Sequence, residues 1–267
     1  QIQTLINELK SDIGAALRVI QHLREGKAFD EATRRLAPII DKNPDDFNVK
    51  LEQARLWRAE EDYLLATNLF EELLDERPED REIRQAYLDC RVNLLEQRIK
   101  ENPADDSLNK ELTQALQERD DHRISILKQH IQAHPEDHPI RLELGRLLVG
   151  DQQYDDAISV LQRLLHEPPM AGQALLILGG CFRERNQLDI ATEQYQKAIQ
   201  YFKNRGYSRV PSDELKEAYY YLGDCLEKRE KTNEAREAYG FIYSTDINYR
   251  DIRTRYERTY QGSSAGD

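Results

Sequence analysis

A histidine-rich segment, HRISILKQHIQAHPEDH (residues 122–138), carries the side chains best suited to hold a metal ion. His130 and His134 lie four residues apart, so one face of a helix would present both imidazoles as a two-point clasp. Asp137 or His138 would supply a third ligand from across the following turn. The alternative is that these are polar surface residues near a helix end, where histidine is favoured. We favour that alternative and expect no metal and no other cofactor.

Paired carboxylates are the other groups that could do chemistry, as a general acid and its base. Asp155–Asp156 and Glu71–Glu72 are such pairs, but they lie at helix starts or on solvated faces, where acids simply favour the helix dipole. The sequence also lacks the GxSxG, HExxH and GxxxxGK[ST] motifs, and it has no GxGxxG that opens a helix after a strand. We therefore expect the chain not to be an enzyme.

The cysteines Cys90, Cys181 and Cys225 are odd in number and show no CxxC spacing. Small buried apolar residues are the interpretation we favour over a disulfide or a metal site.

The net charge of −12 argues against nucleic acid as the partner, because such binders usually need a basic face. No run of about 18 apolar residues exists, which argues against membrane insertion. The first residues, QIQTLINELKSD, form neither a signal peptide nor a targeting helix, and they lack an initiator Met. We expect a processed protein or a fragment of a longer one. The compartment is not identified, although the sequence favours a soluble, cytoplasmic protein over an exported one.

A spacing of 34 residues recurs along the chain and indicates the elements that carry these groups. The stretch 144–169 places a glycine, an aromatic residue, an alanine, a leucine and a proline in fixed order, and the next copy follows 34 residues later. A second pair of copies near the N-terminus keeps the same phase, and a last copy follows at 44 residues. The matching positions are Gly145, Tyr154, Ala157, Leu161 and Pro169; Gly179, Leu188, Ala191 and Tyr195; Phe29, Ala32, Leu36, Ile39 and Pro44; Tyr63, Ala66, Phe70, Leu73 and Pro78; Gly223, Ala235, Tyr239 and Ile242.

Each copy predicts two helices joined by a polar turn. In the first helix, helix A, apolar residues recur at helical spacing, and the glycine allows the second helix, helix B, to approach closely. Ala157 is the small residue of helix B that faces helix A. Pro169 ends the copy, because proline cannot continue a helix. One pair cannot bury both of its faces, so neighbouring pairs must stack.

This pattern resembles the tetratricopeptide repeat family over residues 13–44, 47–78, 138–169, 172–203 and 216–247. The resemblance implies an all-α fold, a right-handed superhelical solenoid of antiparallel helix pairs. It also implies a concave groove, lined by the helices A, in which partners usually bind.

The chain divides into segments by how well they keep this pattern. Residues 13–78 hold two repeats and residues 138–247 hold three, with an insert near 203–213. Residues 79–135 are degenerate helical repeats: 81–101 predicts one long helix or a pair with a collapsed turn, and 105–134 predicts a helical pair, although Arg123 stands where helix B prefers a small residue. The remaining predicted segments are the end of a preceding helix (1–12), a C-terminal capping helix (248–260) and a disordered tail (261–267). This C-terminal arrangement of a capping helix and a tail resembles the ends of many bacterial tetratricopeptide arrays.

The resemblance places the second, fifth, ninth and twelfth position of each copy in the groove. An acidic chain then carries arginines beside an apolar stripe, which fits an acidic and apolar peptide. The alternative is that the fifth positions are core and that the arginines only pair with acids on their own helix. The candidate partner-binding residues are Arg24, Arg55, Arg58, Arg146, Arg183, Leu142, Leu176 and Tyr220.

Two further interpretations concern the partner. Family members that hold chaperone C-termini carry a lysine and asparagines where this chain has Leu17, Gln21 and Glu52, so that specificity is not expected. The insert offers Tyr201, Phe202 and Tyr207 either as a secondary docking corner or as a loop that packs on itself.

We therefore expect a non-catalytic scaffold or adaptor that binds an acidic and apolar protein segment in its groove. The alternatives are a structural or assembly subunit of a larger complex that uses convex or terminal faces, and the regulatory arm of a longer enzyme.

Overall fold

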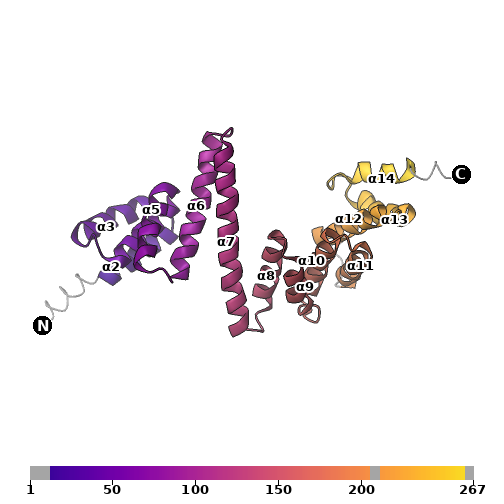
Figure 1. Ribbon diagram of the computed structural model, residues 1–267, viewed down its shortest axis with the longest axis horizontal. Helices are drawn as coiled ribbons and strands as arrows, with labels where there is room; N and C mark the ends of the chain where they lie inside the picture. The colour runs from indigo at the N-terminus through magenta and orange to yellow at the C-terminus, as the bar shows by residue number, and fades with distance from the viewer. Residues whose placement is uncertain (1–12, 205–210, 262–267) are drawn as a thin grey trace. The chain divides into compact units, whose positions relative to one another are not determined.

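The computed structural model describes residues 13–204 and 211–261, and over these ranges the chain is all-α (Figure 1). Thirteen helices are present in the described ranges, packed in sequence order as antiparallel pairs. Their packing divides the chain into two compact units, Gln1–Arg123 and Ile124–Asp267.

The first unit holds two helical pairs and then two long helices. These are α2 (Ile13–Glu25), α3 (Phe29–Lys42), α4 (Phe47–Ala59), α5 (Tyr63–Glu76), α6 (Arg81–Glu101) and the first part of α7 (Asp106–Ala133). The second unit begins within α7 and holds three pairs and a final helix. These are α8 (His138–Gly150), α9 (Tyr154–Gln162), α10 (Ala171–Glu184), α11 (Leu188–Asn204), α12 (Asp213–Lys228), α13 (Thr232–Thr245) and α14 (Ile252–Gln261).

A short turn of sequence Pro-x-Asp precedes four of the helices. The proline ends the preceding helix, and the aspartate two residues later caps the next one. Asp46, for example, accepts hydrogen bonds from the backbone N–H groups of Asn48 and Val49 at 2.9 and 3.0 Å. The four prolines and their caps are Pro44 and Asp46, Pro78 and Asp80, Pro103 and Asp105, and Pro135 and Asp137.

The turn between helices A and B has one backbone feature that recurs in all five copies. The fifteenth residue of each copy, which lies in this turn, adopts the left-handed conformation, with φ between 57° and 65°, although none of the five residues is glycine. These residues are Lys27, Glu61, Gln152, Asn186 and Glu230.

The core of each pair forms around its small residues. The predicted alanine of helix B is fully buried in all five copies. The glycine of helix A works differently from the sequence expectation, because a side chain rather than the backbone of helix B fills its place. A Cβ atom on Gly145 would lie 2.4 Å from Leu161, and one on Gly179 would lie 2.6 Å from Tyr195.

The prediction of a helical pair over residues 105–134 was wrong. A single helix, α7, runs from Asp106 to Ala133, because the segment contains neither proline nor glycine to end a helix. Arg123 therefore lies within one continuous helix and not at the start of a helix B. Of the two alternatives for residues 81–101, the structure shows the single long helix, α6.

The predicted C-terminal helix, α14, begins at Ile252 and packs on α13. Its apolar edge is only partly used: Ile252 is fully buried, Tyr256 stacks on Tyr243 with ring centroids 4.6 Å apart, and Tyr260 is 51% exposed. The expectations for residues 1–12 and 262–267 lie outside the described residues.

Candidate functional site

In the first unit, a depression of about 290 Å³ opens between α2 and α4. In each unit, the surface formed by the second, fifth, ninth and twelfth positions of the helices A is called here the A-face of that unit, and this depression lies on the A-face of the first unit. Six residues of the lining are the second, fifth and ninth positions of the two copies, and the remaining four lie beside them. The lining residues are Gly14, Leu17, Gln21, Asn48, Leu51 and Arg55, with Ile13, Arg18, Asp46 and Glu52.

Arg24 joins the two helices A of the first unit. Its Nε donates to Glu52 Oε1 at 2.8 Å, and the two side chains are only 19% and 6% exposed. A buried carboxylate of this kind requires a cation, because an unpaired one would lose its hydration without compensation. The ion pair of Arg24 with Glu52 therefore links α2 to α4, and it leaves the Arg24 guanidinium less available to a partner.

Arg55 and Arg58 are held more loosely. Arg55 lies 3.7 Å from Glu52 and 4.0 Å from Glu82, and Arg58 lies 3.5 Å from Asp89, with both arginines more than a third exposed. Exposed pairs at these distances contribute little to stability. The two guanidinium groups therefore remain accessible on the A-face.

In the second unit, the fifth positions differ in their exposure. Leu142 is 5% exposed and belongs to the core around α8 and α9, whereas Leu176 is half-buried. Tyr220 is 8% exposed, and its hydroxyl donates to Asp251 Oδ1 at 2.6 Å. Among these three side chains, Leu176 presents the most surface.

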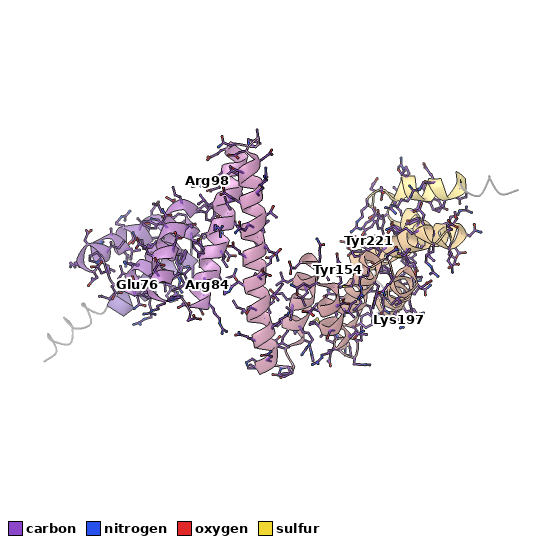
Figure 2. The ribbon with its side chains drawn as sticks, in the orientation of Figure 1. Glu76, Arg84, Arg98, Tyr154, Lys197 and Tyr221 are labelled. Atoms are coloured by element: carbon purple, nitrogen blue, oxygen red, sulfur yellow. The ribbon has the colours of Figure 1, made fainter. Side chains whose placement is uncertain are left out.

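The two A-face arginines of the second unit have different partners. Arg146 is exposed and donates to the neutral amide of Gln173 at 3.1 Å. The guanidinium carbon of Arg183 lies over the ring of Tyr221, which Figure 2 labels, at 4.1 Å from the centroid, and Arg183 also pairs with the neighbouring Glu184 at 2.7 Å. Burial would lower the pKa of Arg183, but the nearby tyrosines and Glu184 raise it.

The last copy carries acids at its ninth and twelfth positions, where each of the other four copies has at least one arginine, and α14 supplies the cations that pair with these acids. Arg255 of α14 donates to Asp224 at 2.8 Å and to the hydroxyl of Tyr239 at 3.1 Å. Arg258, also in α14, lies 2.5 Å from Glu227. Burial alone would raise the pKa of Asp224, but hydrogen bonds from Arg255 and a neighbouring lysine hold it below its usual value. Sequence reasoning missed these pairs, which join residues about 31 positions apart.

The predicted docking corner is only partly described, because Tyr207 lies outside the described residues. Tyr201 and Phe202 end α11 and are half-buried. Their rings pack over Gly172, where a Cβ atom would lie 2.4 Å from Tyr201 and 2.8 Å from Phe202. This packing corresponds to the alternative in which the two rings pack against the chain itself.

Two histidines of the histidine-rich segment each lie close to a carboxylate of the chain. His130 Nε2 lies 2.8 Å from Asp137, which also caps α8, and His138 Nε2 lies 3.3 Å from Glu167. Over residues 13–204 and 211–261, no three His, Cys, Asp or Glu side chains come together in a way that would hold a metal ion.

The three cysteines are free and buried, as expected for small core residues, and burial raises the pKa of each thiol to about 11. Within the same described ranges, every helix is too short or too polar to cross a membrane.

Models of the tetratricopeptide repeat match residues 142–209 and 217–240 of the chain. No curated protein gives a sequence match.

Several solved structures resemble the chain at low sequence identity. The C-terminal part of a TPR repeat-containing protein from Cytophaga hutchinsonii is 17% identical, with a TM-score of 0.53 over 90% of this chain and 98% of that one. YrrB, described as a TPR protein with an unusual peptide-binding site, is 15% identical, with a TM-score of 0.49 over 83% of this chain and 97% of that one. PilW, a type IV pilus biogenesis factor, is 15% identical, with a TM-score of 0.46 over 90% and 96%.

Proposed function

Because this chain is a tetratricopeptide repeat protein, of a family that typically mediates protein–protein interactions, we propose that it is a non-catalytic adaptor. It binds an acidic and apolar segment of a protein partner on the A-face, the surface that forms the concave groove in this family.

The observation that carries the proposal is the depression between α2 and α4. It places the leucines of two fifth positions, Leu17 and Leu51, beside the guanidinium of Arg55 and the amide of Gln21. A lining that combines leucines with an accessible guanidinium suits a segment that alternates apolar and acidic side chains.

The A-face of the second unit offers the same combination of groups. Arg146 has an amide rather than a carboxylate as its described partner, and Leu176, which follows that amide residue by three positions in α10, is half-buried. A partner carboxylate would give Arg146 the ionic contact that Gln173 does not provide.

The experiment is capture of partners from the native cell extract with the tagged chain, followed by mass spectrometry. A variant carrying Arg55→Glu, Arg146→Glu and Arg183→Glu should lose the partner, and rising salt should weaken the wild-type complex. The matched control carries Arg34→Glu and Lys197→Glu, which reverse the charge of two exposed side chains on helices B (Lys197 is labelled in Figure 2). This control variant should retain the partner.

A second candidate is a structural subunit that uses the opposite, helix-B side. A cavity of about 550 Å³ lies between α11 and α13, with α12 as its floor, and its lining includes Glu234 and Glu237. Tyr219 and Phe241 stack at its edge with ring centroids 4.1 Å apart. A partner lost with Glu234→Lys and Glu237→Lys, but retained by the A-face variant, would establish this candidate and overturn the first.

A further inference from the structure

One hydroxyl group in the core of the second unit lacks a hydrogen-bond partner. Tyr195 of α11 is 1% exposed, and its hydroxyl forms no hydrogen bond within the described structure. A buried hydroxyl in this state costs free energy, and native proteins rarely retain one without a reason.

The hydroxyl lies just beneath the A-face. The ring of Tyr195 fills the place of a side chain at Gly179, and its oxygen would lie 3.9 Å from a Cβ atom on Gly180. Gly180 is the ninth position of its copy, where the other copies carry Gln21, Arg55, Arg146 and Asp224. Gly180 therefore places no side chain over the hydroxyl, which other side chains cover instead.

The last copy shows how an equivalent hydroxyl is satisfied. Tyr239 occupies the place of Tyr195, 44 residues later, and its ring fills the space beside Gly223 in the same way. Its hydroxyl donates to the carboxylate of Glu227 at 3.0 Å and accepts from Arg255 at 3.1 Å. A carboxylate and a guanidinium thus meet at this tyrosine.

Among the described residues, Tyr195 has the guanidinium of Arg183 nearby, but its hydroxyl is hydrogen-bonded to no carboxylate, and Glu217 acts on it only through its charge. Arg183 stands in the place of Glu227, one turn beyond Gly180. Its described carboxylate contact is the exposed Glu184, and its charge interacts with Tyr195 strongly enough to affect the pKa of both groups.

We propose that Gly180, Arg183 and Tyr195 form a subsite for one Asp or Glu side chain of the partner segment. The carboxylate accepts the hydrogen bond of the Tyr195 hydroxyl and pairs with Arg183. The subsite deepens the proposed function and rests on it. Because the hydroxyl oxygen is itself buried, a side chain above it must change rotamer on binding; Arg183, held by a ring face and an exposed pair, is the one we expect to move.

The first test uses acetate as the probe, with the full chain labelled with ¹³C in its tyrosine rings. Acetate should shift the Tyr195 ring resonance, assigned by its loss in Tyr195→Phe, in a saturable manner. Acetamide, which has the same shape without the charge, should not shift it at matched ionic strength. Arg183→Gln should abolish the response, and Arg58→Gln, also on the A-face, should leave it intact. An equal response to acetamide, or one that survives Arg183→Gln, overturns the subsite.

The second test uses the partner captured by the adaptor experiment. Tyr195→Phe should weaken its binding about tenfold or more, as expected for a lost hydrogen bond to a charged group. If the triple A-face variant abolishes binding while Tyr195→Phe leaves it unchanged, the proposed function stands and the subsite is wrong. If neither variant affects binding, both are wrong.

Discussion

Arg24 and Glu52 form a hydrogen-bonded ion pair, with Nε 2.8 Å from Oε1, between the first two helices A. The arginine comes from the twelfth position of one copy, and the carboxylate comes from the sixth position of the next. Arg24, which was predicted to bind a partner, therefore also holds two repeats together.

We expect Arg24→Ala to lower the free energy of unfolding of the chain by about 2 kcal/mol, because the buried Glu52 carboxylate loses its hydrogen-bonded cation and keeps only the more distant Arg55, at 3.7 Å. Urea unfolding followed by circular dichroism measures the change. Arg34→Ala, which removes an exposed pair with Glu31, is the matched control and should have little effect. Equal effects of the two substitutions would show that the Glu52 pair is no stronger than a surface contact.

The hydroxyls of Tyr195 and Tyr239 should respond in opposite ways to removal. Tyr195→Phe deletes a group without a partner, so the free energy of unfolding should stay constant or rise by up to about 1 kcal/mol. Tyr239→Phe deletes a group bonded to Glu227 and Arg255, and stability should fall by about 2 kcal/mol. Thermal and urea unfolding of the two variants side by side decide the point. A stability loss in Tyr195→Phe as large as in Tyr239→Phe would contradict it.

Two glycines of α8 should differ in their tolerance of a methyl group. Gly145→Ala places a Cβ atom 2.4 Å from Leu161 in the core and should cost about 2 kcal/mol. Gly150→Ala meets no atom within 4 Å and should leave the free energy of unfolding unchanged or slightly raised, because alanine favours the helix. Denaturant midpoints at constant m-value provide the measurement.

Acid should loosen the attachment of α14. The pKa of Asp224 lies below the ordinary aspartate value of 3.8 in the folded chain, because hydrogen bonds from Arg255 and a lysine outweigh the effect of burial. A lowered folded pKa means that the stabilisation is complete above pH 3.8 and is lost as the pH falls through the folded value.

Stability measured from pH 6 down to the acid range should therefore fall more steeply in the wild type than in Asp224→Asn. Parallel curves for the two proteins would show that the Asp224–Arg255 pair contributes nothing to the acid response.

The repeats could be predicted from sequence because their determinants are local. Alanine at the start of helix B and proline at its end recur at a fixed spacing, and each constrains only its own helical pair. The pairing of Arg24 with Glu52, or of Asp224 with Arg255, could not be predicted in this way. Those contacts join residues about 30 positions apart, and their formation depends on how neighbouring pairs stack.

The prediction for the middle of the chain was wrong for a different reason. The expected pair in residues 105–134 rested on repeat length, whereas α7 continues because no residue within it stops a helix. Exposure was equally hard to read: Leu142 and Leu176 occupy the same position of successive copies, yet the first is core and the second is half-buried.

The packing of each helix on its sequence neighbours has a kinetic consequence. Contacts that close only short loops cost little chain entropy to form, so folding can start at any well-formed pair and spread to the next. The pair of α10 and α11, whose core includes the fully buried Tyr195 and Ala191, is a suitable nucleus. Unfolding should then also proceed one helical pair at a time rather than in a single concerted step.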